Sequence, residues 1–214
     1  MAQRCKYCHS KFIPVFFNQK DCGKEICRDK FVKETLEKAK KKREKDAKKE
    51  QLTQRKNRKI EKDNIKTLGQ WKNTLQPLIN QIARLIDYGQ PCIATGSYVG
   101  KMNGGHCIAV GANSTLRYNL HNIHIQSEHS NSYKGGDSIR YKQGIEKVYG
   151  KDYLEFIESL HALPEINLSI INIQQVMPIV RTIIKELKDR EQIYNPEERM
   201  ELREQLNERI GIYK

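Results

Sequence analysis

The sequence predicts an α+β chain that is mostly helical and is built from small modules. Hydrophobic residues make up only 37% of the 214 residues, which is too little apolar material for one large core. Residues 31–66 contain neither glycine nor proline, and apolar residues recur at helical spacing in the segments that follow this stretch and in the C-terminal part. Strand-like apolar runs occur in the central residues 91–150, so we expect the β structure there.

The N-terminal residues 1–30 contain two short cysteine pairs, Cys5 with Cys8 and Cys22 with Cys27, separated by thirteen residues. The chain has no N-terminal signal peptide pattern, so we expect a cytoplasmic protein whose thiols stay reduced. Two short thiolate pairs across a loop are what a closed tetrahedral zinc site requires. We therefore predict a zinc-binding knuckle in which structural Zn²⁺ supplies much of the folding free energy.

Residues 31–66 are almost wholly polar, with fifteen Lys and Arg against seven Asp and Glu, so they carry eight of the thirteen net positive charges of the chain. Acid-first pairs such as Glu34 with Lys38 favour a long exposed helix. A basic helical arm of this kind would bind phosphates without reading sequence, and its charges include the consecutive cations Lys40, Lys41, Lys42 and Arg43. The alternative is a solvated spacer.

Residues 67–90 predict an amphipathic helix, because Trp71, Leu75 and Ile82 recur at helical spacing. Residues 151–214 predict a helical C-terminal part, with helices around 172–190 and 196–209. These helices would pack on the central module or pair with a second subunit, so a homodimer is one expected state. The chain has no apolar run of the roughly 20 residues that a membrane helix needs, and we expect no membrane partner.

The central residues 91–150 gather the groups that could carry chemistry. His106 follows the glycine pair Gly104 and Gly105 and begins an apolar stretch, and Asn122 precedes a second one. Hydrolysis of a phosphodiester needs an activated water, a cation for the developing charge and a group that holds the base in the useful tautomer. The spacing predicts a strand, a loop, a strand and a helix that could present these groups together.

The runs LRYNLHNIHIQ and SNSYKGGDSIRY resemble the NinG family of lambdoid phages and prophages, and the order of His106, Asn122 and Asn131 resembles the His-Asn-His (HNH) finger, a ββα-metal fold. The likeness extends to the N-terminal cysteines, the basic helix and the helical C-terminal part. It implies a structure-selective endonuclease of phage recombination that acts in the host cytoplasm and cuts branched double-stranded DNA such as Holliday junctions and D-loops.

The resemblance also implies roles for single residues. His106 would be the general base that activates water, and Asn122 would make the hydrogen bond that orients its imidazole. Asn131 would be a ligand for the catalytic cation, Mg²⁺ or Mn²⁺. Lys134 and Arg117 would contact phosphates.

Two positions depart from the family pattern. Gly105 stands where HNH enzymes often carry a metal ligand, and candidates for the missing ligand are Asn103, Asp137 and His124. Relatives commonly frame the finger with two cysteine pairs that bind zinc, whereas this chain has a single cysteine among the corresponding positions Cys92, Thr95, Ser127 and Ser130. We therefore expect a finger without structural zinc, held by apolar packing.

These departures leave a second function open. A non-catalytic, zinc-containing, DNA-binding recombination accessory protein with a decayed finger would keep the cysteines and the basic arm. A zinc protein that binds RNA is a third interpretation, which the basic arm allows.

Overall fold

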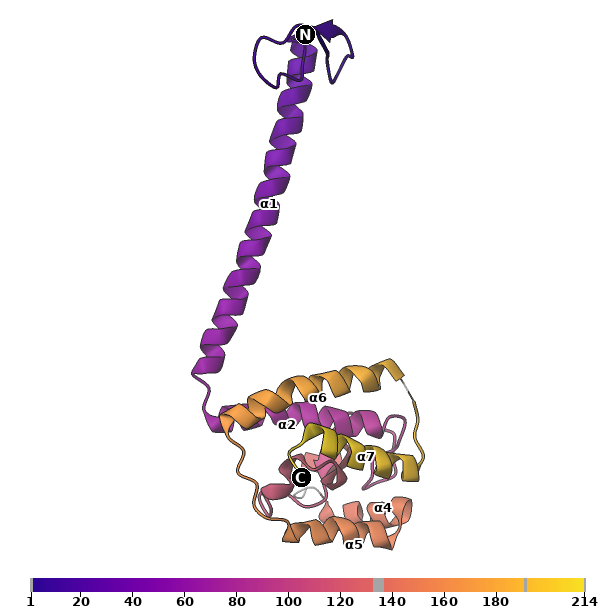
Figure 1. Ribbon diagram of the computed structural model, residues 1–214. Coiled ribbons are helices and arrows are strands. Elements are labelled where there is room, and N and C mark those ends of the chain that lie inside the picture. Colours follow the sequence, from indigo (N-terminus) through magenta and orange to yellow (C-terminus); the bar gives the residue numbers. More distant parts are fainter. Residues whose placement is uncertain (1, 133–136, 191, 214) are drawn as a thin grey trace. The chain divides into compact units, whose positions relative to one another are not determined.

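The computed structural model describes residues 2–132, 137–190 and 192–213 and divides into two compact units at the junction of Ile65 and Lys66 (Figure 1). In the N-terminal unit, strands β1 (Gln3–Arg4) and β2 (Lys11–Phe12) pair antiparallel. The rest of the unit is dominated by helix α1 (Glu25–Asn64), whose 40 residues would extend about 60 Å.

Helix α1 begins at Glu25, six residues before the start of the predicted basic arm at residue 31. The helix therefore includes the last cysteine of the knuckle. Cys27 lies in its first turn and is the one residue of α1 that is buried. The remainder of the helix is exposed or half-exposed, so it has no apolar stripe to pack against a core. The long exposed helix that the charge pattern predicted is therefore present.

The larger unit has its main core between three helices, α2 (Leu68–Ile86), α6 (Ile170–Arg190) and α7 (Pro196–Ile210). Helices α2 and α6 lie side by side (Figure 1). The predicted apolar stripe of α2 is confirmed, since Trp71, Leu75 and Ile82 are buried. Thr67 and Gln70 form a capping box at the start of α2, and the helix continues through Pro77.

The central module is a β-hairpin with short helices. Strand β3 (Met102–His106) pairs antiparallel with β4 (Ile123–Ser127), so that His106 lies opposite Ile123. Two 3₁₀ turns, η1 (Thr115–Tyr118) and η2 (Leu120–Asn122), lie in the connection. After β4 come α3 (Glu128–Ser132), α4 (Ser138–Tyr149), α5 (Lys151–Ser159) and the 3₁₀ turn η4 (Leu160–Ala162).

The predicted C-terminal helices are confirmed as α6 and α7, and Asn195 caps α7 through a capping box with Glu198. The chain is thus mostly helical, with its strands in two short hairpins. Within the described ranges, every helix is too short or too polar to span a membrane.

A buried ion pair joins α7 to the hairpin. Arg203 is 0% exposed, and its Nη2 lies 2.8 Å from both carboxylate oxygens of Asp87. Arg203 also donates to the carbonyl oxygen of Leu120 through Nε at 3.1 Å. Asp87 in turn accepts the backbone N–H of Ile125 in β4 at 2.9 Å. The C-terminal helix therefore fixes the strand that faces His106.

Candidate functional site

The four N-terminal cysteines gather into one cluster. The ligand atoms of Cys5, Cys8, Cys22 and Cys27 all lie within 4.8 Å of one another, and the Sγ atoms of Cys8 and Cys22 are 3.6 Å apart. A tetrahedral zinc site with Zn–S bonds of about 2.3 Å places its sulfur atoms about 3.8 Å apart. These residues therefore fit a structural metal ion such as zinc.

Local hydrogen bonds support thiolates at Cys5 and Cys8, whereas burial and the neighbouring thiols raise the pKa of Cys27 to about 12. The backbone N–H of Tyr7 points at Cys5 Sγ at 3.5 Å. Hydrogen bonds from the side chain and backbone of Ser10 lower the pKa of Cys8 to about 6. His9, the neighbouring residue that could have been a ligand, is exposed and is not part of the four-residue cluster.

His106 ends strand β3 and is half-buried at the start of the hairpin connection. Its Nε2 lies 3.0 Å from the backbone carbonyl oxygen of Arg117. A carbonyl oxygen only accepts hydrogen bonds, so Nε2 carries the proton and Nδ1 keeps its lone pair. Burial lowers the pKa of His106, and the charge of Arg117 lowers it further, which favours the neutral ring that a general base needs.

Asn122 does not orient the imidazole of His106 directly, contrary to the prediction. Its Oδ1 accepts the backbone N–H of Ile108 at 2.8 Å, and its Nδ2 donates to the carbonyl oxygens of Ile108 and Leu116 at 3.0 and 3.3 Å. The side chain is 0% exposed and is committed to these backbone groups. Asn122 therefore holds the connection in place, and the carbonyl of Arg117, next to Leu116, makes the bond to His106.

Tyr141 fastens helix α4 to the same hairpin. Its hydroxyl donates to the carbonyl oxygen of Gly105 at 2.9 Å and accepts the backbone N–H of His124 at 2.9 Å. The ring of His124 is 0% exposed, packs against Tyr149 at 5.3 Å between centroids, and has a pKa well below its usual value because of burial. This histidine is part of the core, which does not suit a ligand for a solvent-borne cation.

The other predicted ligands lie apart from His106. Asn131 is in α3, which leaves the hairpin at the end opposite His106, and it forms no hydrogen bond to His106. Asp137 caps α4 in a left-handed conformation and lies 3.7 Å from Arg140. Lys134 falls outside the described residues.

The space beside Gly105, the position before His106, is occupied by the side chain of Gln126. A Cβ atom on Gly105 would collide with the side chain of Gln126, which is buried beside it. Among the described His, Cys, Asp and Glu residues, three or more potential metal-binding atoms gather only at the N-terminal cysteines. The described residues of the central module therefore contain no cluster of three such ligands for the catalytic Mg²⁺ or Mn²⁺ that the sequence predicted.

The four positions that correspond to framing cysteines do come together. Cys92 Sγ lies 3.4 Å from Ser130 Oγ, which lies 3.0 Å from Ser127 Oγ. Burial opposes ionisation of Cys92, but hydrogen bonds from Ser127, Ser130 and Thr95 outweigh it and lower the pKa of Cys92 to about 6. One thiol among hydroxyls cannot form a tetrahedral thiolate site, so hydrogen bonds join these segments where relatives were expected to use zinc.

The expected apolar packing contributes as well. Leu116, Leu120 and Ile123 are fully buried, and Ile108 and Ile125 are nearly so. Because hydrogen bonds accompany this packing, the hairpin is held by both kinds of interaction, whereas the sequence predicted packing alone.

The predicted phosphate-binding cations differ in their surroundings, because Arg117 is hydrogen-bonded to neighbouring side chains and residues 40–43 are exposed on a helix. The guanidinium of Arg117 donates to the amide oxygens of Gln76 and Asn73 at 3.0 and 3.2 Å. Both partners are neutral, so its positive charge is not compensated by them. Residues 40–43, with Lys40 and Arg43 at the ends, are fully exposed along α1.

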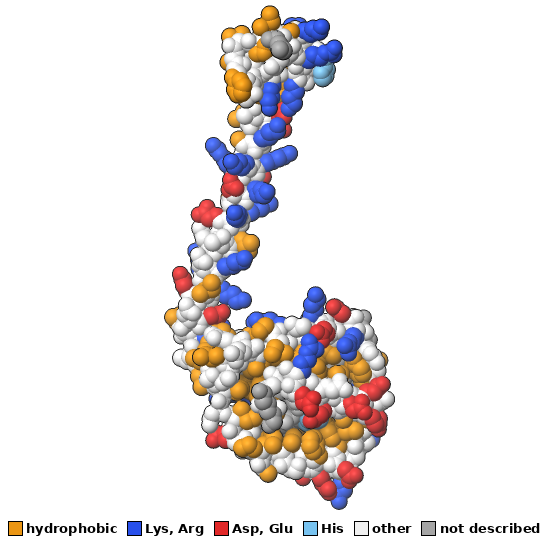
Figure 2. Space-filling view, viewed as in Figure 1, with side chains coloured by type: hydrophobic (Ala, Val, Ile, Leu, Met, Phe, Trp, Pro, Cys, Tyr) orange, Lys and Arg blue, Asp and Glu red, His pale blue; other side chains and the backbone are white. Residues whose placement is uncertain are grey.

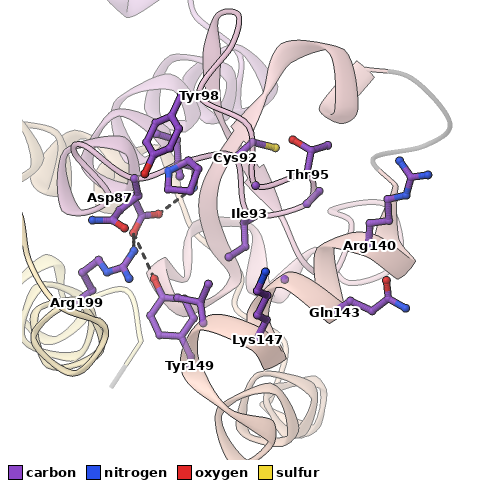
Figure 3. Close-up of a pocket in the computed structure, with 17 residues that line it drawn as sticks. Asp87, Cys92, Ile93, Thr95, Tyr98, Arg140, Gln143, Lys147, Tyr149 and Arg199 are labelled. Carbon is purple, nitrogen blue, oxygen red and sulfur yellow. Dashed lines mark hydrogen bonds and ion pairs between the residues drawn. The ribbon is translucent and has the colours of Figure 1, made fainter.

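A separate cavity of about 530 Å³ lies between the turn after α2, helix α4 and helix α7 (Figure 3). Lys147 points toward Ile93 in this view, while Asp87, Tyr149 and Arg199 meet at another wall. No predicted catalytic residue lines the cavity.

Sequence reasoning missed the Asp87–Arg203 pair and the role of His121. A single aspartate after an apolar helix and one arginine in a charged helix carry no local signal of pairing. His121 is buried between Tyr153, 2.8 Å from Nδ1, and Glu204, 2.8 Å from Nε2, and burial lowers its pKa to about 4. It therefore acts as a structural link between the hairpin connection, α5 and α7.

Known proteins match most of this chain. The family model described as "Bacteriophage Lambda NinG protein" matches residues 1–191. "Protein ninG" of Escherichia phage 933W is 31% identical over 173 residues, covering 74% of this chain and 81% of the relative. "Protein ninG" of Escherichia phage lambda is 32% identical over 166 residues, with the same two coverages, and so is the protein of that name from Salmonella phage P22. No solved structure matches.

Proposed function

This chain belongs to the NinG family of bacteriophage proteins, and on that premise we propose that it is a structure-selective endonuclease that hydrolyses branched DNA during phage recombination. The observation that carries the proposal is the state of His106. Its Nε2 is bonded to the carbonyl of Arg117, and its Nδ1 is left as a proton acceptor at the end of a β-hairpin that a helix covers. This arrangement supports an HNH-like role.

In the proposed reaction, Nδ1 of His106 takes a proton from the water that attacks phosphorus. The P–O bond to one of the two flanking sugars breaks, and the leaving sugar oxygen takes a proton from solvent. The lowered pKa of His106 keeps the ring neutral near pH 7, so it is ready to accept that proton. Asn122 acts as a positioning residue, because it holds the connection that contains the carbonyl of Arg117. The uncompensated guanidinium of Arg117 would attract the phosphate.

The N-terminal unit would supply affinity for DNA. The four cysteines would hold one zinc ion that keeps the knuckle folded, and the exposed lysines and arginines of α1 would lie along phosphates. Contacts of this kind release counterions, so binding should weaken steeply as salt rises.

Two observations at the hairpin favour the second function, a non-catalytic accessory protein. The side chain of Gln126 fills the space beside Gly105 where HNH enzymes often carry a ligand, and the described residues of the central module contain no cluster of three His, Cys, Asp or Glu ligands. These features favour a non-catalytic DNA-binding recombination accessory protein. No step of the proposed reaction is therefore assigned to the cation, and its requirement is tested directly.

The deciding experiment incubates the full chain with a labelled four-way junction or a linear duplex, in Mg²⁺, Mn²⁺ or EDTA. We expect nicking of the junction, little of the duplex and none in EDTA. His106→Ala should lower the nicking rate about 10²-fold to 10⁴-fold while junction binding is kept. The matched control is His161→Ala, which changes an exposed histidine outside the hairpin.

Three outcomes would reject parts of this proposal. Junction binding without nicking in either cation would favour the accessory protein. Nicking that survives His106→Ala would remove His106 as the base. Nicking in EDTA would show that the reaction needs no divalent cation.

A homodimer would suit symmetric cleavage of a junction, because each subunit would bring one active site. Ile171 and Ile193, at 64% and 63% exposed, are apolar side chains available near the two ends of α6. Sedimentation of the full chain with and without junction DNA measures the oligomeric state. A monomer under both conditions would reject this part.

A further inference from the structure

The N-terminal unit exposes an apolar turn that the cysteine cluster does not explain. In residues 13–17, Ile13 is 76% exposed, Val15 90%, Phe16 63% and Phe17 91%. Burying such side chains is favourable, and contiguous exposed apolar groups mark interaction sites. The turn therefore has the composition of a binding surface.

The turn is held in shape by a buried side chain. Gln19 is 9% exposed, and its Oε1 accepts the backbone N–H of Val15 at 2.8 Å. Its Nε2 donates to the carbonyl oxygen of Asp21 at 2.9 Å, and its backbone N–H donates to that of Phe16 at 3.3 Å. Because this frame fixes the backbone that carries the two rings, less conformational entropy remains to be lost on binding.

Positive charge accompanies the rings. Arg4 in β1 lies directly opposite Lys11 in β2, both are exposed, and neither forms an ion pair with a described residue. Like charges opposite each other across a strand pair are unfavourable unless an anion lies nearby. Residues 1–30 contain seven Lys and Arg against three Asp and Glu. Figure 2 shows apolar and basic side chains together on this unit.

Exposed aromatic rings and cations without an ion-pair partner among the described residues, in the same small unit, match one ligand chemistry in particular. Single-stranded nucleic acid offers bases that stack on aromatic rings and phosphates that pair with cations, whereas duplex DNA keeps its bases stacked inside. A protein partner of the apolar residues alone would gain nothing from Arg4 and Lys11 unless it were acidic. We propose that the turn at residues 13–17 binds unpaired bases of single-stranded DNA, with Phe16 and Phe17 as stacking platforms.

This binding site is independent of catalysis by His106, because it lies in the other unit of the chain. A protein that cannot nick DNA would still bind unpaired bases through it, and a nuclease without it would still cut. The two proposals can therefore fail separately. If both hold, the turn would recognise unpaired bases at branch points.

The test uses the full chain and fluorescence anisotropy with three labelled ligands, an oligothymidylate of about 20 nucleotides, an abasic strand of equal length and a duplex. The double variant Phe16→Leu/Phe17→Leu keeps apolar character but removes both rings. Stacking of about 1–3 kcal/mol per base predicts at least about a tenfold loss of affinity for oligothymidylate. Affinity for the duplex should stay within about twofold, and wild type should bind the abasic strand as weakly as the variant binds oligothymidylate.

Two controls protect the result. Val15→Ala changes an equally exposed residue that has no ring and should leave affinity for oligothymidylate unchanged. Phe17→Trp keeps a ring, should retain affinity and should add tryptophan fluorescence that oligothymidylate quenches. This variant also tests the site if the leucine variant fails to retain its zinc.

Several results would overturn the proposal. Unchanged affinity of the leucine variant for oligothymidylate, or absence of quenching in Phe17→Trp, would show that the rings do not stack on bases. Equal affinity of wild type for the abasic strand and oligothymidylate would reduce the site to phosphate contacts. A wild-type dimer that the leucine variant converts to a monomer would assign the turn to self-association instead.

Discussion

Replacing Arg203 by methionine should destabilise the larger unit strongly. The guanidinium of Arg203 is 0% exposed and contacts both oxygens of Asp87, which is itself 1% exposed. Removing it leaves Arg199, at 3.6 Å, as the cation paired with that carboxylate among the described residues. Breaking a buried ion pair typically costs about 3–5 kcal/mol, and because Arg199 keeps part of the pairing with Asp87, we expect a loss near the lower end of that range.

Trp71 supplies the assay. It is the only tryptophan of the chain and lies in the core of the larger unit at 5% exposed, so its fluorescence in a urea titration reports unfolding of that unit. The double variant Asp87→Asn/Arg203→Met removes both charges but keeps an oxygen for the N–H of Ile125. It should recover part of the loss caused by Arg203→Met alone, and the part that is not recovered includes the buried Arg199, which loses its contact with the carboxylate of Asp87.

Arg209→Met is the matched control, because the pair of Arg209 with Glu186 is exposed and should contribute less than about 1 kcal/mol. A free energy of unfolding for Arg203→Met within about 1 kcal/mol of the wild-type value would contradict this role of the pair, because about 1 kcal/mol is the resolution of the titration. The role is also contradicted if the double variant is less stable than the single one, since that would mean that charge burial is not the dominant cost.

Three further predictions concern the metal, the pH dependence and the hairpin. Elemental analysis should find one zinc per chain, lost in Cys22→Ser, and a second zinc would contradict the hydroxyl cluster at Cys92. Because burial lowers the pKa of His121 to about 4 while the unfolded ring titrates near about 6.5, the unfolded state binds more protons between these values. Stability should therefore fall by up to about 3 kcal/mol as pH drops from about 6.5 to 4, and His121→Gln should flatten this slope in urea titrations. Tyr141→Phe should cost about 1–2 kcal/mol, since it removes a buried hydroxyl that bonds to two backbone groups, and a loss under about 0.5 kcal/mol would contradict that role.

The N-terminal cysteine cluster could be predicted from sequence because its members are close together in the chain. Two cysteines separated by two residues reach one metal through a single turn, so spacing alone indicates the site. The long helix was equally predictable, because its charge pairs and the absence of glycine and proline act over one helical turn. Its start was not, since Cys27 belongs to the knuckle and to the helix at once.

The hairpin site was only partly predictable. Sequence singled out His106 and Asn122, but it assigned the wrong partner to the imidazole, because a backbone carbonyl such as that of Arg117 leaves no signature in a sequence. The fit of Gln126 against Gly105 was equally hidden. Both depend on how two strands are registered and on which side chain then fills a given space.

The sequence alone therefore determined the elements whose causes are local, namely the cysteine cluster, the basic helix and the amphipathic stripes of α2 and α6. Tertiary structure alone decided the pairing of Asp87 with Arg203, which lie 116 residues apart, and the meeting of Cys92 with Ser130, 38 residues apart. The physical reason is that burial sets the strength of polar contacts. An aspartate or a serine has many potential hydrogen-bond partners in a sequence. Packing of the core excludes water from the buried side chain and places one of these partners next to it.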